Sequence, residues 1–298
     1  MLSALLAAPA LLALLAGCGD HSSAPTPEPA PSASGAPRYD GSLPPARAVM
    51  ALVPADATSL AVTDFDEVKA GFGENELSSR DPVAERSAFW RRADRGAPML
   101  TPGLLRPADA ALTRRFGFGA ADVAWEATFT RSDGNGWVIR LADGVRMAKV
   151  KQALDAGVGP LANARVDVAD HLLMRAAAEP GQPNWAADPT LTALVDTTAA
   201  GTYVARGCLE GAPGTERLQP LHAYAVSLAS TLATARLGAD REDLFARMHR
   251  GRRLPVFNRV FTHPVADPAS GRIGYRMADP AAAAEVVLRR QLPFAVCG

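Results

Sequence analysis

One order of expected elements occurs twice in this chain and limits the folds it can adopt. It consists of two strands, a helix, a further strand, and a helix that starts at Asp-Pro. The first series has hairpin strands at 123–130 and 137–141, a helix at 143–156, strands at 164–168 and 172–175, and a helix opening at Asp188-Pro189. The second has strands at 222–227 and 231–236, a helix at 240–248, a strand at 272–277, and a helix from Asp279-Pro280 to 290. Strand pairs that segregate with helices favour an α+β fold, with an antiparallel sheet and helices on one face. The series are either two duplicated ferredoxin-like units, 46–200 and 201–298, or a chance recurrence of a common pattern, and both can belong to one continuous domain.

Further elements are expected ahead of the first series. Residues 58–62 predict a strand, and Asp64 with Glu67 three residues later has the spacing of a capping box. Asp caps helices well and Pro suits the first helical position, so Asp81-Pro82 predicts a helix, and another is expected from Pro107. Asp143 and Asp240 are expected to cap the helices that they open. The core-facing side chains predicted for these helices and for the strand at 123–130 are Phe65, Val68, Val83, Phe89, Trp90, Ala93, Leu112, Phe116, Val123, Trp125, Ala127, Phe129, Met147, Val150, Leu154, Leu244, Phe245 and Met248.

The first eighteen residues have the pattern of an export signal. Residues 2–16 are almost all Leu and Ala, a run shorter than the about 20 apolar residues that span a bilayer but typical of a signal peptide. It ends in Leu15-Ala16-Gly17-Cys18, which resembles the lipobox of bacterial lipoprotein precursors. The resemblance implies a signal peptide at 1–17, cleavage before Cys18, and acylation of Cys18 with fatty acids such as palmitate. The alternative is a buried N-terminal helix followed by an ordinary cysteine. Because no Lys or Arg precedes Cys18, we expect the coding sequence to extend upstream of Met1.

Residues 18–45 form a tether in this interpretation, since the Pro- and Ser-rich stretch at 22–45 cannot bury enough apolar surface to fold. The order of apolar run, cysteine and tether predicts an exported protein that is lipid-anchored to the outer face of the cell membrane. The body itself resembles uncharacterised exported lipoproteins of GC-rich Gram-positive bacteria. That resemblance rests on the segments 53–56, 62–65 and 292–297, and it implies no activity.

Two cysteines remain once Cys18 is assigned to lipid, namely Cys208 and Cys297. Disulfides persist in extracytoplasmic compartments, so we predict a Cys208–Cys297 bridge that ties the C-terminus to the start of the second series. The alternative is two separate buried thiols. We expect no metal site, because no His or Cys lies at ligand spacing from either cysteine.

The charge balance and the absence of known motifs argue against several classes of function but do not identify one. The 31 Lys and Arg balance 31 Asp and Glu, which argues against a nucleic-acid binder. The sequence holds no nucleophile elbow, phosphate loop, zinc-protease motif or dinucleotide fingerprint, and we expect no catalytic residue and no cofactor. The pair Asp170-His171 is interpreted as an exposed turn. Arginine clusters could bind an anion or be solvated helix ends: Arg91-Arg92, Arg114-Arg115, Arg250 with Arg252-Arg253, and Arg289-Arg290.

The function predicted from these observations is non-enzymatic binding of an envelope ligand or protein partner by a membrane-anchored extracytoplasmic lipoprotein. One alternative is a scaffold or assembly component of an envelope complex, which a large exposed apolar patch would favour. Another is a surface hydrolase with a non-standard site. An apolar cleft that holds two carboxylates or a histidine with a strongly shifted pKa would favour the hydrolase.

Overall fold

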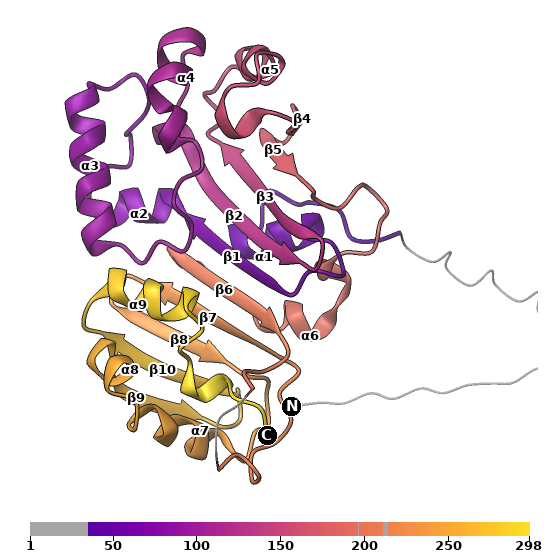
Figure 1. Ribbon diagram of the computed structural model, residues 1–298, viewed down its shortest axis with the longest axis vertical. Helices are drawn as coiled ribbons and strands as arrows, with labels where there is room; N and C mark the ends of the chain where they lie inside the picture. The colour runs from indigo at the N-terminus through magenta and orange to yellow at the C-terminus, as the bar shows by residue number, and fades with distance from the viewer. Residues whose placement is uncertain (1–34, 196, 211–213) are drawn as a thin grey trace, which may run out of the picture. The chain divides into compact units, whose positions relative to one another are not determined.

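A ten-stranded antiparallel sheet organises the protein. The computed structural model describes residues 35–298 except 196 and 211–213, and residues 35–298 form one compact unit (Figure 1). The strand order is β4-β5-β3-β2-β1-β6-β7-β8-β10-β9. The predicted α+β class with an antiparallel sheet is confirmed.

The sheet has the same strand order on either side of its centre. There, β1 (Ser59–Asp64) pairs with β6 (Gly201–Arg206) in antiparallel orientation. Outward from β1 lie β2 (Val123–Arg131), β3 (Gly134–Leu141), β5 (Leu172–Arg175) and β4 (Arg165–Asp167). Outward from β6 lie β7 (Ala223–Ala229), β8 (Leu232–Arg236), β10 (Arg272–Met277) and β9 (Phe261–Asp267). Each half therefore carries five strands in corresponding positions, as the repeat in the sequence suggested, rather than the four strands of a ferredoxin-like unit.

Helices cover the near face of the sheet, and short helices also cover the rear of its N-terminal half, where the prediction of helices on one face is wrong. Those on the near face in Figure 1 are α2 (Phe65–Gly71), α3 (Val83–Gly96), α4 (Asp109–Phe116), α5 (Met147–Asp155), α7 (Leu244–Gly251), α8 (Pro255–Val260) and α9 (Pro280–Leu288). Behind the N-terminal half lie the short helices α1 (Pro45–Ala48) and α6 (Pro189–Thr192), with the 3-10 turns η1 (Val49–Leu52) and η5 (Trp185–Ala187). The alternation of β1 divides the core accordingly: Leu60 and Val62 pack on the rear elements, whereas Ala61 packs in the cluster beneath α7–α9.

Several helix starts are set by the predicted caps. The carboxylate of Asp64 accepts hydrogen bonds from the backbone N–H groups of Asp66 and Glu67, at 3.1 and 3.2 Å. Asp188 and Asp279 cap α6 and α9 in the same way. These side chains satisfy amides that have no partner in the first helical turn.

Other predicted caps are wrong, because neighbouring groups compete for the same carboxylates. Asp81 accepts from the backbone N–H and hydroxyl of Ser78 instead of capping α3. Asp143 pairs with Arg140, and α5 begins only at Met147. The N-cap of α7 is Asp243, not the predicted Asp240.

Two predicted core positions are also wrong. Val83 is the first residue of α3 and is 68% exposed. Phe245 is 50% exposed, because Leu244 and Met248 define the buried side of α7 and the next residue lies about 100° around the helix. Val123 is buried as predicted, but a bulge between Val123 and Trp125 places it in the near cluster, away from the other apolar residues of β2.

Candidate functional site

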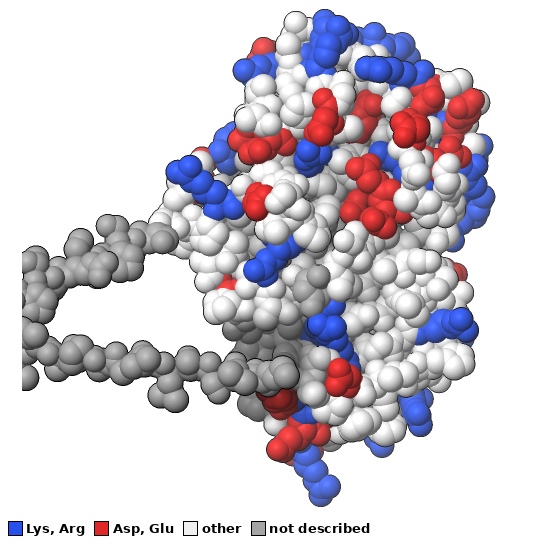
Figure 2. Space-filling view, turned by 180° about the vertical axis from the view of Figure 1, so that it is seen from behind, with Lys and Arg blue, Asp and Glu red and all other residues white. Residues whose placement is uncertain are grey.

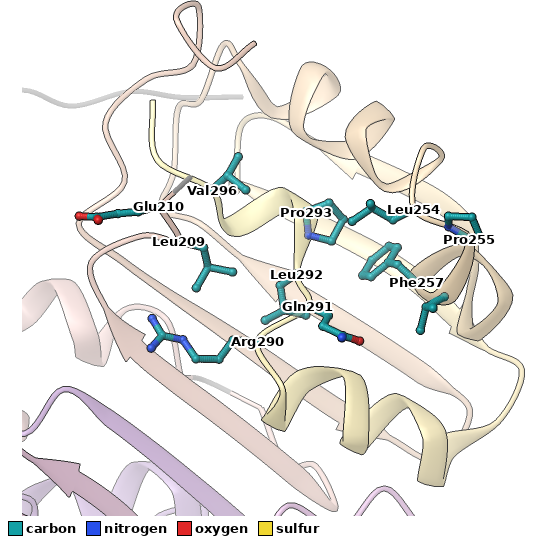
Figure 3. Close-up of a pocket in the computed structure, with 11 residues that line it drawn as sticks. Leu209, Glu210, Leu254, Pro255, Phe257, Arg290, Gln291, Leu292, Pro293 and Val296 are labelled. Atoms are coloured by element: carbon teal, nitrogen blue, oxygen red, sulfur yellow. The ribbon is translucent and has the colours of Figure 1, made fainter. Parts of the chain in front are cut away.

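An apolar groove lies beside the C-terminal tail of the protein (Figure 3). We name it the tail groove. Its volume is about 340 Å³, within the range of small-molecule pockets. Four segments supply its walls: the chain after β6, the start of α8, the turn after α9, and the tail around the 3-10 turn η6 (Pro293–Ala295). The lining residues are Leu209, Glu210, Leu254, Pro255, Val256, Phe257, Arg290, Gln291, Leu292, Pro293 and Val296.

The two ends of the tail groove differ in chemistry. Figure 3 shows Glu210 and Arg290 at one end, with Leu254, Pro255 and Phe257 at the other. Pro255 occupies the first turn of α8, where the fixed φ of proline suits the helix. The groove is therefore amphipathic along its length.

One rim of the tail groove exposes three consecutive apolar residues. Leu254 is 44% and Val256 47% exposed, and Pro255 between them is exposed as well. Three neighbouring apolar residues at the surface are unusual in a soluble protein unless they contact something. This run marks a candidate surface that was not predicted from the sequence, and its position directly after an arginine cluster was the available signal.

A disulfide fixes the opposite wall. Cys208 and Cys297 are bonded, with 4.9 Å between their Cα atoms, so the predicted bridge is confirmed. Leu209 pairs with Val296 as a short parallel bridge. The N–H of Leu209 donates to the carbonyl of Ala295 at 2.8 Å, and the N–H of Cys297 donates to the carbonyl of Leu209 at 2.9 Å. The tail is thus held in place beside the groove by covalent and hydrogen bonds.

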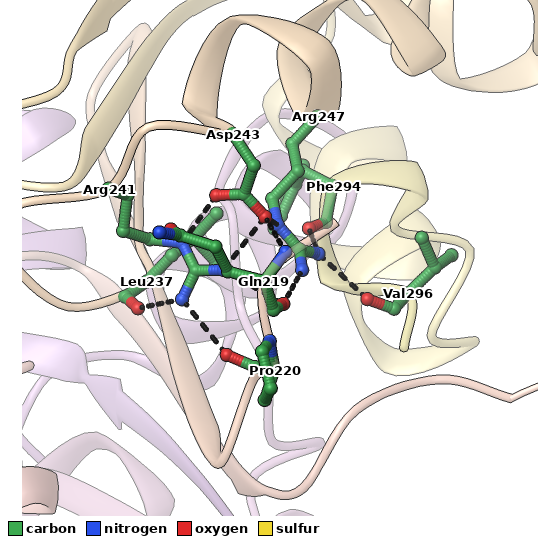
Figure 4. A network of polar contacts seen from close by, with 8 residues as sticks. All are labelled: Gln219, Pro220, Leu237, Arg241, Asp243, Arg247, Phe294 and Val296. Atoms are coloured by element: carbon green, nitrogen blue, oxygen red, sulfur yellow. Dashed lines mark hydrogen bonds and ion pairs between the residues drawn. The ribbon is translucent and has the colours of Figure 1, made fainter. Parts of the chain in front are cut away.

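A buried ionic network supports the same tail from within (Figure 4). Arg247 is fully buried and donates from Nε to Asp243 at 2.6 Å. Its two Nη atoms donate to the carbonyls of Phe294 at 2.9 Å, Val296 at 2.7 Å and Gln219 at 2.7 Å.

Asp243 is held by a second arginine. Arg241 donates to its carboxylate from Nε and Nη2, both at 2.8 Å, in a bidentate pair. Burial alone would raise the pKa of Asp243, but the hydrogen bonds from Arg241 and Arg247 outweigh burial and hold the pKa below its ordinary value. The carboxylate therefore stays charged and fixes both guanidinium groups.

The structure locates all four arginine clusters noted in the sequence, two of them near the tail groove. Arg250 lies in the last turn of α7, Arg252 and Arg253 follow that helix just before the exposed run, and Arg289-Arg290 follow α9. Arg290 lines the tail groove, and Arg289 lines an adjoining cavity together with Arg259 and Val256. Arg289 and Arg290 thus line cavities that Val256 also lines, whereas Arg250, Arg252 and Arg253 line neither of them. The other two clusters lie elsewhere, Arg91-Arg92 on α3 and Arg114-Arg115 on α4.

A second cavity, of about 670 Å³, lies near the first described residues of the chain. Arg38, Arg165 and Asp167 line it together with apolar residues such as Leu52 and Met174. Arg165 pairs with Glu179 in its wall at 2.7 Å. Its mixed lining indicates no single class of ligand.

Two buried carboxyl groups have raised pKa values, but both are explained by structural roles. Burial raises the pKa of Asp64 to about 6, and its carboxylate caps α2. Burial also raises the pKa of Glu126, which accepts from the N–H groups of Gly103 at 3.2 Å and Leu104 at 2.6 Å. Neither lines the tail groove or the second cavity, so the cleft with paired carboxylates that would favour a hydrolase is not formed by them.

The remaining predictions from the sequence concern a histidine, a metal site and the acylated cysteine. His171, predicted in an exposed turn, lies in the β4–β5 turn with Nδ1 at 3.3 Å from the carbonyl of Ala142. Within the described part of the chain, no group of three His, Cys, Asp or Glu side chains could hold a metal ion. Cys18 lies outside the described residues, and none of the described helices is long and apolar enough to cross a membrane. No family model, curated protein or solved structure matches this chain.

Proposed function

We propose that this chain is a lipid-anchored extracytoplasmic protein whose body binds an envelope amphiphile in the tail groove without chemical conversion. The observation that carries the proposal is the apolar groove of about 340 Å³ with a charged end. An amphiphile matches it, because an apolar chain can lie along Phe257 and Leu292 while a polar head meets Glu210 and Arg290.

The anchor in this proposal is Cys18. Its support is the resemblance of residues 15–18 to a lipobox and the Pro- and Ser-rich tether that follows. The Cys208–Cys297 disulfide agrees with an oxidising, extracytoplasmic location. Two acyl signals at one cysteine would hold the protein stably on a bilayer, whereas a single chain gives only marginal binding.

The anchor is tested by metabolic labelling. Cells that express the full chain are fed an alkyne-labelled palmitate, and the Cys18→Ser variant serves as control. The expected result is label and membrane fractionation for the wild-type chain, and loss of both in the variant. Equal labelling of the two chains would refute acylation at Cys18.

Groove binding is tested with a dansylated fatty acid, whose emission rises when its chain enters an apolar site. Val256→Asp places a charge on the groove rim and is expected to weaken binding at least about tenfold, because a carboxylate disfavours apolar contact. Val265→Asp is the matched control, since Val265 is 70% exposed and lies on β9 outside the groove. Equal affinity of all three proteins would refute the groove as the binding site.

A scaffold role is the second candidate, and the rear of the sheet favours it. Leu232 on β8 is 60% exposed, and Val265 on β9, in the same half of the sheet, is 70% exposed. Figure 2, which views the molecule from behind, shows fewer charged side chains over the lower half than over the upper half. If the rear face assembles with a protein, Leu232→Asp is expected to abolish a complex that cross-linking detects in the wild-type envelope, whereas Val256→Asp would leave it intact.

A further inference from the structure

The surface around the tail groove combines exposed apolar residues with clustered positive charge. The exposed run at 254–256 is preceded by Arg252 and Arg253, and both of these side chains are exposed. Arg259, Arg289 and Arg290 are exposed on the neighbouring α8 and on the end of α9. We name this set, Arg252 to Val256 with Arg259, Arg289 and Arg290, the basic apolar surface.

Acidic side chains balance little of this charge. Glu285 pairs with Arg289, and Glu210 lies at the polar end of the groove. Because the whole chain is neutral, with 31 basic and 31 acidic residues, a local surplus of arginine means that charge is distributed unevenly. On the rear face of the N-terminal half, Figure 2 shows positive and negative side chains interspersed.

We propose that the basic apolar surface docks the body onto a bilayer that contains anionic phospholipid. Arginines at such a surface meet the headgroups, while Leu254 and Val256 enter the boundary between headgroups and acyl chains. Charge complementarity selects an anionic partner. The apolar run selects a lipid surface, because those side chains gain from burial away from water.

The proposal deepens the proposed function, since a lipid anchor would already hold the body beside a membrane. The lipid anchor and the docking surface can nevertheless be refuted separately. The anchor is read at Cys18, whereas docking is measured with the body 35–298, which lacks Cys18. The apolar clusters of the described residues lie between Ala46 and Ala295, so this body retains its core and its disulfide.

The experiment is vesicle flotation with the body 35–298. Phosphatidylcholine vesicles are compared with vesicles that also contain phosphatidylglycerol. The expected result is binding to the anionic vesicles that weakens with added salt, because salt screens exposed charges. No binding to the anionic vesicles at low salt, or equal binding to both kinds, would overturn the proposal.

Charge reversal tests the location. Arg252→Glu with Arg253→Glu is expected to lower partitioning at least about tenfold, since each basic residue near an anionic surface contributes appreciably. Arg114→Glu with Arg115→Glu is the matched control: it makes the same change of net charge on α4, where both arginines are exposed, and should leave partitioning within about twofold. An equal loss in both double variants would refute a localised surface.

Apolar contact is tested with Val256→Asp against Val265→Asp. Only the first is expected to reduce flotation, while circular dichroism and the intact Cys208–Cys297 disulfide report that each variant is folded. Analytical sedimentation of the wild-type body tests whether a second copy of the chain occupies this surface instead of lipid. Self-association that Val256→Asp abolishes, without vesicle binding, would assign the surface to a second copy and reject lipid docking.

Discussion

Replacing Arg247 by Met is the sharpest test of how the tail groove is held together. Arg247 is fully buried, and its guanidinium donates to Asp243 and to three backbone carbonyls. Met preserves much of the apolar volume but no donor. Breaking a buried ion pair by removing one partner typically costs about 3 to 5 kcal/mol, because the remaining polar groups stay buried without compensation.

The value expected here is near the lower end, about 3 kcal/mol, because Asp243 keeps its bidentate pair with Arg241. The loss then falls mainly on the carbonyls of Phe294, Val296 and Gln219. Urea denaturation measures it as a lower midpoint with an unchanged slope. A loss below about 1 kcal/mol would refute the reasoning, since it would mean that water replaces the guanidinium without cost.

A surface pair supplies the matched control for this variant. Arg289 and Glu285 form an i,i+4 pair on α9 whose side chains are 62% and 60% exposed. Arg289→Met is expected to change the unfolding free energy by less than about 1 kcal/mol, because exposed ion pairs contribute little. Arg247→Met should also cost less in the reduced protein than in the oxidised one, since the network and the disulfide restrain the same tail.

The remaining predictions concern the disulfide and the two buried carboxyl groups. The Cys208–Cys297 disulfide joins residues 89 positions apart, and its reduction is expected to lower the unfolding free energy by about 4 to 5 kcal/mol, because the unfolded chain gains conformational entropy. Urea titration with and without reductant measures this difference. Unchanged stability would contradict the prediction. A carboxyl with a raised folded pKa stabilises the fold below its unfolded pKa and loses that contribution as pH rises through the folded value. For Asp64 this loss of stability spans pH about 4 to about 6 and amounts to about 3 kcal/mol. Asp64→Asn keeps a capping oxygen but cannot titrate, so it should remove that pH dependence. Urea titrations from pH 4 to 7 measure the difference. Glu126→Gln should cost about 1 to 3 kcal/mol by depriving a buried N–H in the 100–104 loop of its acceptor, and faster limited proteolysis there is the readout.

Sequence reasoning identified the elements whose side chains alternate, and it missed β6, one of the two central strands. The hairpin of β2 and β3 was predicted because its strands have a clear period of two and a Gly-rich turn. β6 was missed, since it is buried on both faces apart from its last residue and shows no alternation. β9 was missed as well, because Pro264 lies within it and is typical only of edge strands.

The candidate site was foreseen only in its parts. The pairing of Cys208 with Cys297 followed from the count of cysteines and the expected compartment. The clusters at 250–253 and 289–290 were visible as sequence, but nothing in their spacing says that Arg289 and Arg290 line cavities together with Val256 at the start of α8. Arg247 lies within the helix predicted at 240–248, but nothing in the sequence marked it as the buried donor to the tail that the structure shows.

The sequence by itself determined the local elements of this protein, because periodicity, caps and turn residues act over a few neighbouring positions. It also predicted the disulfide and the order of a repeated α+β pattern. Only the tertiary structure decided that β1 and β6 join the two halves into one sheet, and that three segments far apart in the chain (209–210, 254–257 and 290–296) enclose the tail groove. The physical reason is that those contacts depend on packing between residues far apart in the chain, which no short sequence window contains.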